Sequence, residues 1–290
     1  MSTDDFGILS FGAYVPRSRL QRKAIAAANA WFAPGLRGLA KGERAICNWD
    51  EDSITMGVEA ARDCLAGFDR QALTQLVLAS STLPFGDRQN AGVVANALQL
   101  KSALRSIDQS GSQRAGSTAL AATLDGGGAP GRTLVVAADT RKSKVGSTQE
   151  MHYGDGAAAV LVGHGEPIAR LIASHSETVD FVHQYRMHDR AHDYAWEERW
   201  VRDEGYLKIV PRAIDAVLKQ AGVEPGAVTH FCLPGTLSRI QAAVAKRCNL
   251  PDASVRDALA AACGDTGVAH PLLMLAAALE EAQPGDLILV

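Results

Sequence analysis

Apolar residues in this chain occur in short unbroken runs, and each run follows a segment whose composition favours a helix. Residues 117–136 and 271–290 share one order of features, an alanine-rich segment, a proline–glycine turn and an apolar run. The two turns, Pro130-Gly131 and Pro284-Gly285, lie 154 positions apart. Unbroken apolar runs are typical of strands covered on both faces, so each stretch predicts a helix, a turn and a buried strand.

A second pair of segments repeats at nearly the same distance. A helix predicted over residues 54–66 precedes an apolar strand at 76–80, and a helix predicted over 207–221 precedes a strand at 229–233. Two matches in the same order indicate an internal duplication of β-α-β units, which predicts covered sheets of the α/β class. The predicted halves are residues 1–165 and 166–290.

The first half ends in a strand that has no counterpart in the second half. The glycines of Gly154-Asp155-Gly156 predict a turn before a buried strand at residues 157–162. No comparable segment follows Val290. We therefore expect the sequence to be truncated at its carboxyl end.

Residues 176–205 interrupt the duplicated pattern with many charged, histidine and aromatic residues. Long excursions from a compact α/β fold usually carry function. We expect this segment to cover the mouth of an active site or to contact another subunit. Its histidines, His183, His188 and His192, suggest metal ligands, but no matching ligand set occurs elsewhere, so the sequence favours a solvated charged surface and predicts no metal.

Composition and charge exclude several classes of protein. Apolar residues make up 47% of the 290 residues, and 29 basic against 32 acidic residues give a net charge of -3. This is a globular composition without a basic stripe, so we expect no nucleic-acid partner. No apolar run reaches the roughly 18 residues that span a bilayer, and the acidic residues 1–5 lack a signal-peptide pattern. We expect a cytoplasmic protein with no membrane partner.

The five cysteines show neither C-x-x-C spacing nor a disulfide framework, so we expect free thiols. The glycine clusters at residues 126–128 and 154–156 lack the G-x-G-x-x-G order of dinucleotide sites. We therefore predict no nicotinamide or flavin, and we expect no covalently bound cofactor.

Candidate chemistry centres on the stretch from Ser112 to Leu120. Small residues after Arg114 predict the opening of a helix, whose free N–H groups favour an anion and lower the pKa of a thiol placed there. This stretch resembles the nucleophile turn of thiolase-superfamily enzymes, with Gln113 at the position of the cysteine. Residues 7–17 and 50–62 resemble the first strand and first helix of the same superfamily, with Asp52 or Ser53 as the helix N-cap.

The whole chain is thus similar to the branch of prokaryotic hydroxymethylglutaryl-CoA synthase and ketoacyl synthase III. The resemblance implies a thiolase-like fold with layers in the order α-β-α-β-α. It also implies four catalytic positions, all replaced here. The cysteine falls on Gln113, the histidine on Cys232, the asparagine on Asp265 and the glutamate on Ser81.

Each replacement leaves alternatives open. Gln113 cannot form a thioester, but its amide could polarise a thioester carbonyl, as in the decarboxylating ketosynthase-like domains it resembles; otherwise it is a polar residue in a silent pocket. Asp265 could have a raised pKa and act as a general base, or it could cap the following helix. His270 could assist, although alone it suggests a packed or capping residue. Cys232 and Cys263 could supply a relocated thiol, or they could simply be small buried residues.

Two functions from different classes follow from this resemblance. The first is an enzyme acting on acyl-CoA thioesters, which forms or breaks a carbon–carbon bond without a cysteine acyl-enzyme. Its candidate catalytic residues are Gln113, Asp265, Cys232 and His270, and coenzyme A thioesters are its substrates. The second is a silent subunit that binds a partner of the zinc-ribbon and OB-fold type. For either function we expect a homodimer, or a heteromer built around such a dimer.

Overall fold

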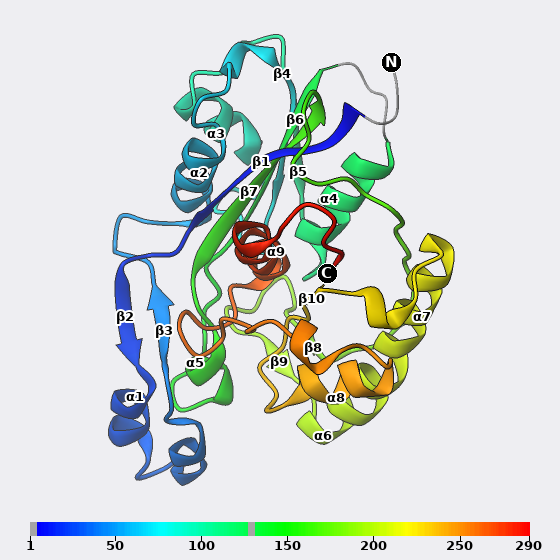
Figure 1. Cartoon of the computed structure of the whole chain (residues 1–290). Helices are drawn as coiled ribbons and strands as arrows, with labels where there is room; N and C mark the ends of the chain where they lie inside the picture. The colour runs from blue at the N-terminus through cyan, green and yellow to red at the C-terminus, as the bar shows by residue number, and fades with distance from the viewer. Residues whose placement is uncertain (1–4, 127–130) are drawn as a thin grey trace.

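The computed structural model describes residues 5–126 and 131–290. Three features of the sequence lie outside these ranges, the acidic residues 1–4, the glycines at 127–128 and Pro130 of the first repeated turn. A five-stranded mixed sheet forms the first half, in the order β1-β7-β6-β4-β5 (Figure 1). Its strands are β1 (Phe6–Tyr14), β4 (Leu73–Ala79), β5 (Arg105–Gln109), β6 (Arg132–Asp139) and β7 (Gly156–His164).

The central strands of this sheet are the unbroken apolar runs of the sequence. Strand β4 pairs in parallel with β5 and β6, and β7 runs antiparallel between β6 and β1. In β6 the residues from Leu134 to Ala138 are completely buried. Both faces of the sheet are therefore covered, as the runs predict.

Helices cover the two faces of the large sheet. On one face, α2 and α3 share a hydrophobic cluster with β4, β6 and β7; on the other, α4 and α9 share a second cluster with the same strands. The Asp52 carboxylate accepts hydrogen bonds from the N–H groups of Ile54 and Thr55, which confirms it as the N-cap of α2. The helix bounds are α2 (Ser53–Cys64), α3 (Asn90–Ala97), α4 (Ala115–Asp125) and α9 (His270–Glu281).

A small parallel sheet of β10 (His230–Phe231) and β11 (Ile288–Leu289) lies beyond α9. Cys232 and Ile288 face α9, whereas Phe231 and Leu289 face α7 (Val210–Ala221) and α8 (Ile240–Arg247). The layers therefore follow the predicted order α-β-α-β-α, with α4 and α9 in the middle.

The two sheets keep traces of the duplication. Strands β4 and β6 pair in parallel, as β10 and β11 do, and the helix before β6 and the helix before β11 share the central layer. Gly131 and Gly285 precede these last strands with φ of +103° and +97°. That left-handed conformation is accessible to glycine without strain, which explains why both turns carry it.

Smaller elements extend from this core. The hairpin of β2 (Ser18–Gln21) and β3 (Glu43–Ile46) frames α1 (Arg22–Asn29) and the 3₁₀ turn η2 (Pro34–Leu39), and α5 (Thr148–His152) lies nearby. Four short 3₁₀ turns are η3 (Arg70–Ala72), η5 (Pro225–Ala227), η6 (Asp252–Ser254) and η7 (Gly267–Ala269).

The segment from residue 176 onward contains a second hairpin, β8 (Gln184–Tyr185) with β9 (Tyr194–Ala195). After it come α6 (Glu198–Trp200) and a π-helical stretch, η4 (Val201–Ile209), which leads directly into α7. The helix predicted over residues 207–221 thus begins later as an α-helix than the pattern indicated.

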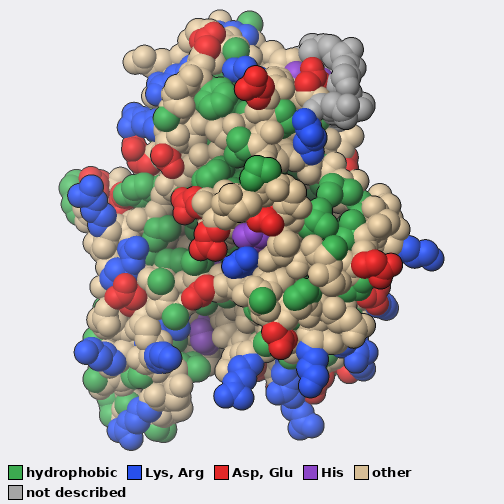
Figure 2. All heavy atoms as spheres, in the orientation of Figure 1, with side chains coloured by type: hydrophobic (Ala, Val, Ile, Leu, Met, Phe, Trp, Pro, Cys, Tyr) green, Lys and Arg blue, Asp and Glu red, His purple; other side chains and the backbone are tan. Residues whose placement is uncertain are grey.

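Acidic and basic side chains are interspersed over most of the face in Figure 2. Among the described residues, no helix is both long and apolar enough to cross a membrane. All five cysteines are free thiols, as their spacing predicts.

The close contact of α4 with the loop before α9 gives a test of this packing. A Cβ at Gly116 would overlap the carbonyl oxygen of Val268, whereas a Cβ at Gly86 would meet open space. We expect Gly116→Ala to lower the free energy of unfolding by about 1–3 kcal/mol, because the central layer must shift. Gly86→Ala is the matched control, and we expect it to change the free energy of unfolding by about 1 kcal/mol or less. Equal urea midpoints for the two variants would contradict the close packing.

Candidate active site

Polar side chains gather where the carboxyl ends of the parallel strands meet. Ser81 follows β4, Gln113 lies between β5 and α4, Asp139 ends β6 and Arg141 follows it. Ligand sites of open α/β sheets lie at this edge, because the loops that leave the strands converge there. We call these four residues, together with Asp265, the Gln113 cluster.

The Gln113 amide is held at both ends. Its Oε1 accepts a hydrogen bond of 3.4 Å from Arg141 Nη1, and its Nε2 donates one of 3.4 Å to Ser81 Oγ. Both bonds are long and therefore weak. A primary amide carries two N–H donors, and the second has no acceptor among the described residues, so it is available to a ligand.

The carboxylate of Asp139 organises the loop that carries Ser81. Asp139 is completely buried and lies against the turn at Gly267. Its donors are Ser80 Oγ at 3.1 Å, Ser81 N at 2.8 Å, Ser81 Oγ at 2.9 Å, Thr82 Oγ1 at 3.0 Å and Val268 N at 3.0 Å. This satisfied carboxylate fixes the position of Ser81 relative to Gln113.

Arg141 places a buried cation beside Gln113. Its Nη2 donates to the backbone oxygen of Asp265 at 2.7 Å and pairs with the Asp265 carboxylate at 2.9 Å. The guanidinium carbon lies 3.8 Å from the centre of the Tyr153 ring. Burial disfavours the charge, but the neighbouring Asp265 outweighs it and raises the pKa of Arg141 above its ordinary value, so the guanidinium stays charged.

Residues of the excursion lie over this cluster. Arg186 donates to the backbone oxygen of Ser81 and forms an ion pair of 3.1 Å with Asp193. The hydroxyl of Tyr153 donates to Asp193 at 2.8 Å. The structure thus places the segment over the mouth of the site, which was one of the two positions expected for it.

No family model matches the chain, but comparisons with known proteins find similar curated proteins and similar solved structures. The hydroxymethylglutaryl-CoA synthase of Aeropyrum pernix is 29% identical over 98% of this chain and 80% of its own length. That of Pyrococcus furiosus is 28% identical over 98% of this chain and 82% of its own length.

Solved structures show the same relationship. 3-Oxoacyl-(acyl carrier protein) synthase III from Pseudomonas aeruginosa has a TM-score of 0.78 and 25% identity, covering 96% of this chain and 90% of its own. A hydroxymethylglutaryl-CoA synthase complexed with CoA has a TM-score of 0.80 and 18% identity, covering 96% and 76%. Over nearly its whole length the chain is similar to hydroxymethylglutaryl-CoA synthases, and it has the thiolase fold of these enzymes and of ketoacyl synthase III.

The prediction of a raised pKa for Asp265 is wrong. Burial alone would raise it, but the Arg141 guanidinium, His270 and the N–H of Gly267 hold the pKa of Asp265 down at about 2. A carboxylate with so low a pKa is a weak base near neutral pH. Arg141 was not among the residues predicted for the site, although it follows the apolar run that ends at residue 136 and therefore lies near the carboxyl end of a buried strand.

His270 is engaged by its own chain. It is 2% exposed, its Nδ1 accepts a hydrogen bond of 3.2 Å from Thr266 N–H, and its Nε2 lies 2.7 Å from the Ala258 carbonyl oxygen. Because Nδ1 is the acceptor, Nε2 carries the proton and donates it. Neither ring nitrogen is left for a substrate, so the structure favours the packed residue over the catalytic assistant.

Both candidate relocated thiols are also buried. Cys232 lies among Met274 and Ala278, with Sγ 3.7 Å from the Met274 carbonyl oxygen, and Cys263 bonds the carbonyl oxygen of Leu259 at 3.3 Å. Burial raises the pKa of each thiol to about 11. A thiolate is therefore scarce at neutral pH, which argues against a relocated nucleophile.

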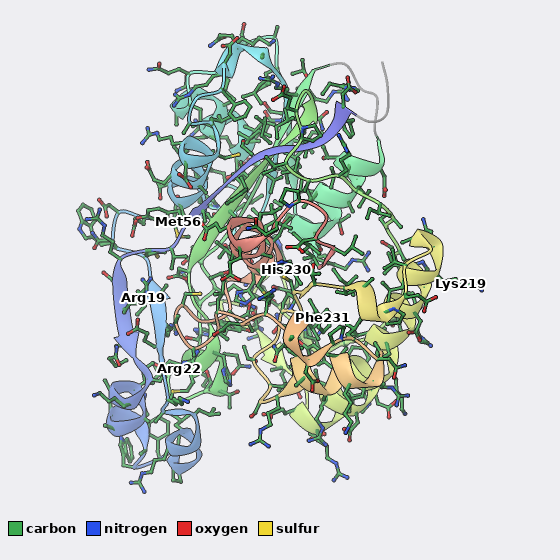
Figure 3. The ribbon with its side chains drawn as sticks, viewed as in Figure 1. Arg19, Arg22, Met56, Lys219, His230 and Phe231 are labelled. Atoms are coloured by element: carbon green, nitrogen blue, oxygen red, sulfur yellow. The ribbon has the colours of Figure 1, made fainter. Side chains whose placement is uncertain are left out.

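His230, two residues before Cys232, lies on β10 in Figure 3. Its Nε2 is 3.1 Å from Asp286 Oδ2, and the side chain is buried beside the small sheet. His230 therefore joins β10 to the turn before β11, and it does not replace the catalytic histidine that the resemblance places at Cys232.

The histidines of the excursion form no metal site in the described structure. The chain between His188 and His192 runs through turns, not a helix. Within residues 5–126 and 131–290, no group of three or more histidine, cysteine, aspartate or glutamate side chains could hold a metal ion. Two surface grooves of about 350 and 280 Å³ are lined by residues outside the Gln113 cluster, around Trp200 and around Tyr14.

The ion pair gives a pH-dependent prediction. The pKa of Asp265 lies below its ordinary 3.8. The ionised carboxylate therefore stabilises the folded protein above pH 4, and this contribution is lost as the pH falls through about 2. We expect the difference in unfolding free energy between the natural protein and Asp265→Asn to shrink by about 2 kcal/mol from pH 6 to pH 2. Urea unfolding at several pH values measures it.

Asp252→Asn, at an exposed aspartate, controls for the loss of one surface carboxylate. A difference for Asp265→Asn that stays constant across this pH range would show that Arg141 does not hold the carboxylate ionised.

Proposed function

We propose that this chain binds acyl-CoA thioesters at the Gln113 cluster and forms or breaks a carbon–carbon bond there without a cysteine acyl-enzyme. The observation that carries the proposal is an amide donor, Gln113, held beside the buried cation of Arg141 at the opening of α4. Named relatives and solved neighbours that act in acyl-thioester chemistry support the substrate class.

The cluster suits the stabilisation of a developing oxyanion. The free N–H of Gln113 can donate to a thioester oxygen, and so can the N–H groups of the first turn of α4 that follow Ala115, whose own N–H donates to the Ser112 carbonyl oxygen. Arg141 binds the Oε1 of the same amide and so polarises it, which strengthens its N–H donors. Both effects grow as negative charge develops on the oxygen, which is the condition for lowering a reaction barrier.

Loss of carbon dioxide is the reaction that this cluster supports best. Aldol chemistry begins with removal of a proton, and the pKa of Asp265 at about 2 makes it a weak base. A thioester with a carboxylate on its α-carbon needs no base: the electrons of the breaking carbon–carbon bond pass to the thioester as an enolate, and carbon dioxide leaves. A proton from water then completes the acyl-CoA product. Asp265 serves in this proposal by holding Arg141.

A silent subunit is the second candidate, and one set of observations favours it. Cys232 and Cys263 are buried with raised pKa values, His270 has both nitrogens engaged, and Asp265 is ion-paired. Of the four predicted catalytic residues, Gln113 is the one whose side chain keeps a free donor. As a silent subunit, the chain would catalyse no reaction and would form a heteromer with an OB-fold and zinc-ribbon protein.

Turnover separates the two functions. We expect carboxylated acyl-CoA thioesters to lose carbon dioxide without forming an acyl-protein adduct. Gln113→Ala should lower kcat by about 10²–10³, the effect of removing one oxyanion donor. Liquid chromatography of CoA esters and intact-protein mass spectrometry measure the two quantities, with the partner protein present.

Ser117→Ala, one turn further along α4, is the matched control and should keep the natural rate, because its hydroxyl bonds only the Arg114 carbonyl oxygen. An acyl adduct on Cys232 or Cys263 would favour the relocated thiol. Absence of turnover with every thioester would favour the silent subunit.

We further propose that the chain forms a homodimer, or the dimeric core of a heteromer, through the free edge of the large sheet. Strand β5 is the last strand of that sheet, and Ile107 in its middle is 37% exposed. Exposed sheet edges are usually covered, often by a second copy of the chain.

Sedimentation velocity at micromolar concentration should show a dimer for the natural chain and a monomer for Ile107→Lys. Val145→Lys, at a residue 66% exposed and away from the edge, is the control and should stay dimeric. A monomeric natural chain would contradict the proposal.

A further inference from the structure

Polar side chains of the β8–β9 hairpin form hydrogen bonds with Ser81 of the Gln113 cluster and with the neighbouring Tyr153. Gln184 and Arg186 point toward the site, where Tyr153 OH donates to Gln184 Oε1 at 3.4 Å and Arg186 donates to the Ser81 carbonyl oxygen. From the other arm, Asp193 accepts from Tyr153 at 2.8 Å, and its side chain is only 3% exposed. The inner face of the hairpin is thus a row of hydrogen-bonding groups.

The outer face carries the apolar side chains. Side chains alternate along a strand, so the neighbours of the inward residues point away from the site. Tyr185 is 45% exposed, Met187 56% and Tyr194 52%. The Tyr185 and Tyr194 rings contact one another across the hairpin, with centroids 5.3 Å apart, instead of entering the core.

No residue of the segment 184–196 joins any of the hydrophobic clusters of the described structure. Segments held by few apolar contacts open at a much lower free energy than core strands. The Arg186–Asp193 pair lies within the hairpin, so the two charges move together and neither is left unpaired when the hairpin lifts. The Arg141–Asp265 pair belongs to the core and stays in place.

We propose that residues 184–196 form a cap that opens and closes over Gln113 and Arg141 to admit a ligand. The closed state is stabilised by the hydrogen bonds and the ion pair of Arg186, Asp193 and Tyr153. Opening breaks the bonds of Tyr153 to Asp193 and Gln184 and that of Arg186 to Ser81, and it exposes the Tyr153 ring on which Arg141 rests. The cap does not depend on which reaction the site performs.

Hydrogen exchange followed by mass spectrometry tests the fastening in the full chain. Arg186→Met and Tyr153→Phe should each raise the exchange rate of peptides from residues 183–196 by about 10-fold or more. Each variant removes a partly buried hydrogen bond that involves a charged side chain or a hydroxyl group. Tyr153→Phe keeps the ring beneath Arg141 and removes only the hydroxyl. Peptides from β6 should exchange at the natural rate.

Two control variants match these changes. Arg190→Met removes an arginine at the exposed tip of the same hairpin, where it pairs only with Asp189, and Tyr206→Phe removes a hydroxyl that bonds Pro234 outside the cap. Neither should change exchange of the cap. The proposal would be overturned if the cap in Arg186→Met and Tyr153→Phe exchanged at the rate of the natural protein. It would also be overturned if exchange of the β6 peptides rose by the same factor as that of the cap.

Access to the site gives a second readout that needs no turnover, so the cap and the proposed reaction can fail separately. A Gln113→Cys variant places a thiol under the cap, and its alkylation by iodoacetamide can be mapped by peptide analysis. Adding Arg186→Met should raise the labelling rate at position 113 by about 10-fold, whereas adding Arg190→Met should leave it unchanged. Equal rates in all three proteins would show that the hairpin does not restrict access.

Discussion

The ion pair of Arg141 and Asp265 is the contact on which the rest of the site depends. It joins the loop after β6 to the loop before α9, so it ties together segments from the two duplicated parts of the chain. A buried cation with no anion beside it is costly, and breaking such a pair on one side costs about 3–5 kcal/mol. The pair also contributes to the position of Gln113, since Arg141 donates a hydrogen bond of 3.4 Å to the amide oxygen.

The same pair decides which chemistry is available. The resemblance to thiolase-superfamily enzymes implies an asparagine at the position of Asp265, whereas this chain has a carboxylate whose charge Arg141 holds. A carboxylate kept ionised by an adjacent cation is a poor proton acceptor, but the cation and the amide remain able to stabilise an oxyanion. In the proposed site a weak base lies beside a cation and an amide donor, and this combination favours reactions that begin without proton removal.

The fold was predictable to a large extent because its signals are local and repeated. The two proline–glycine turns of the sequence precede strands β6 and β11, and Gly131 and Gly285 both have a positive φ, which glycine adopts without strain. Asp52 caps α2 through bonds to residues two and three positions ahead. The site was less predictable, because Arg141 and Asp265 lie 124 residues apart and no periodicity relates them.

By itself the sequence determined the α/β class, the duplication, the helix opening after Gln113 and the loss of an ionisable nucleophile there. These properties depend on side-chain chemistry and on neighbours within a few positions. The tertiary structure alone decided that Asp265 is ionised, that Cys232 and His270 are enclosed, and that Arg186 and Asp193 cover the site. Charge state, burial and access depend on groups that folding brings together from distant parts of the chain, and a local pattern carries no information about them.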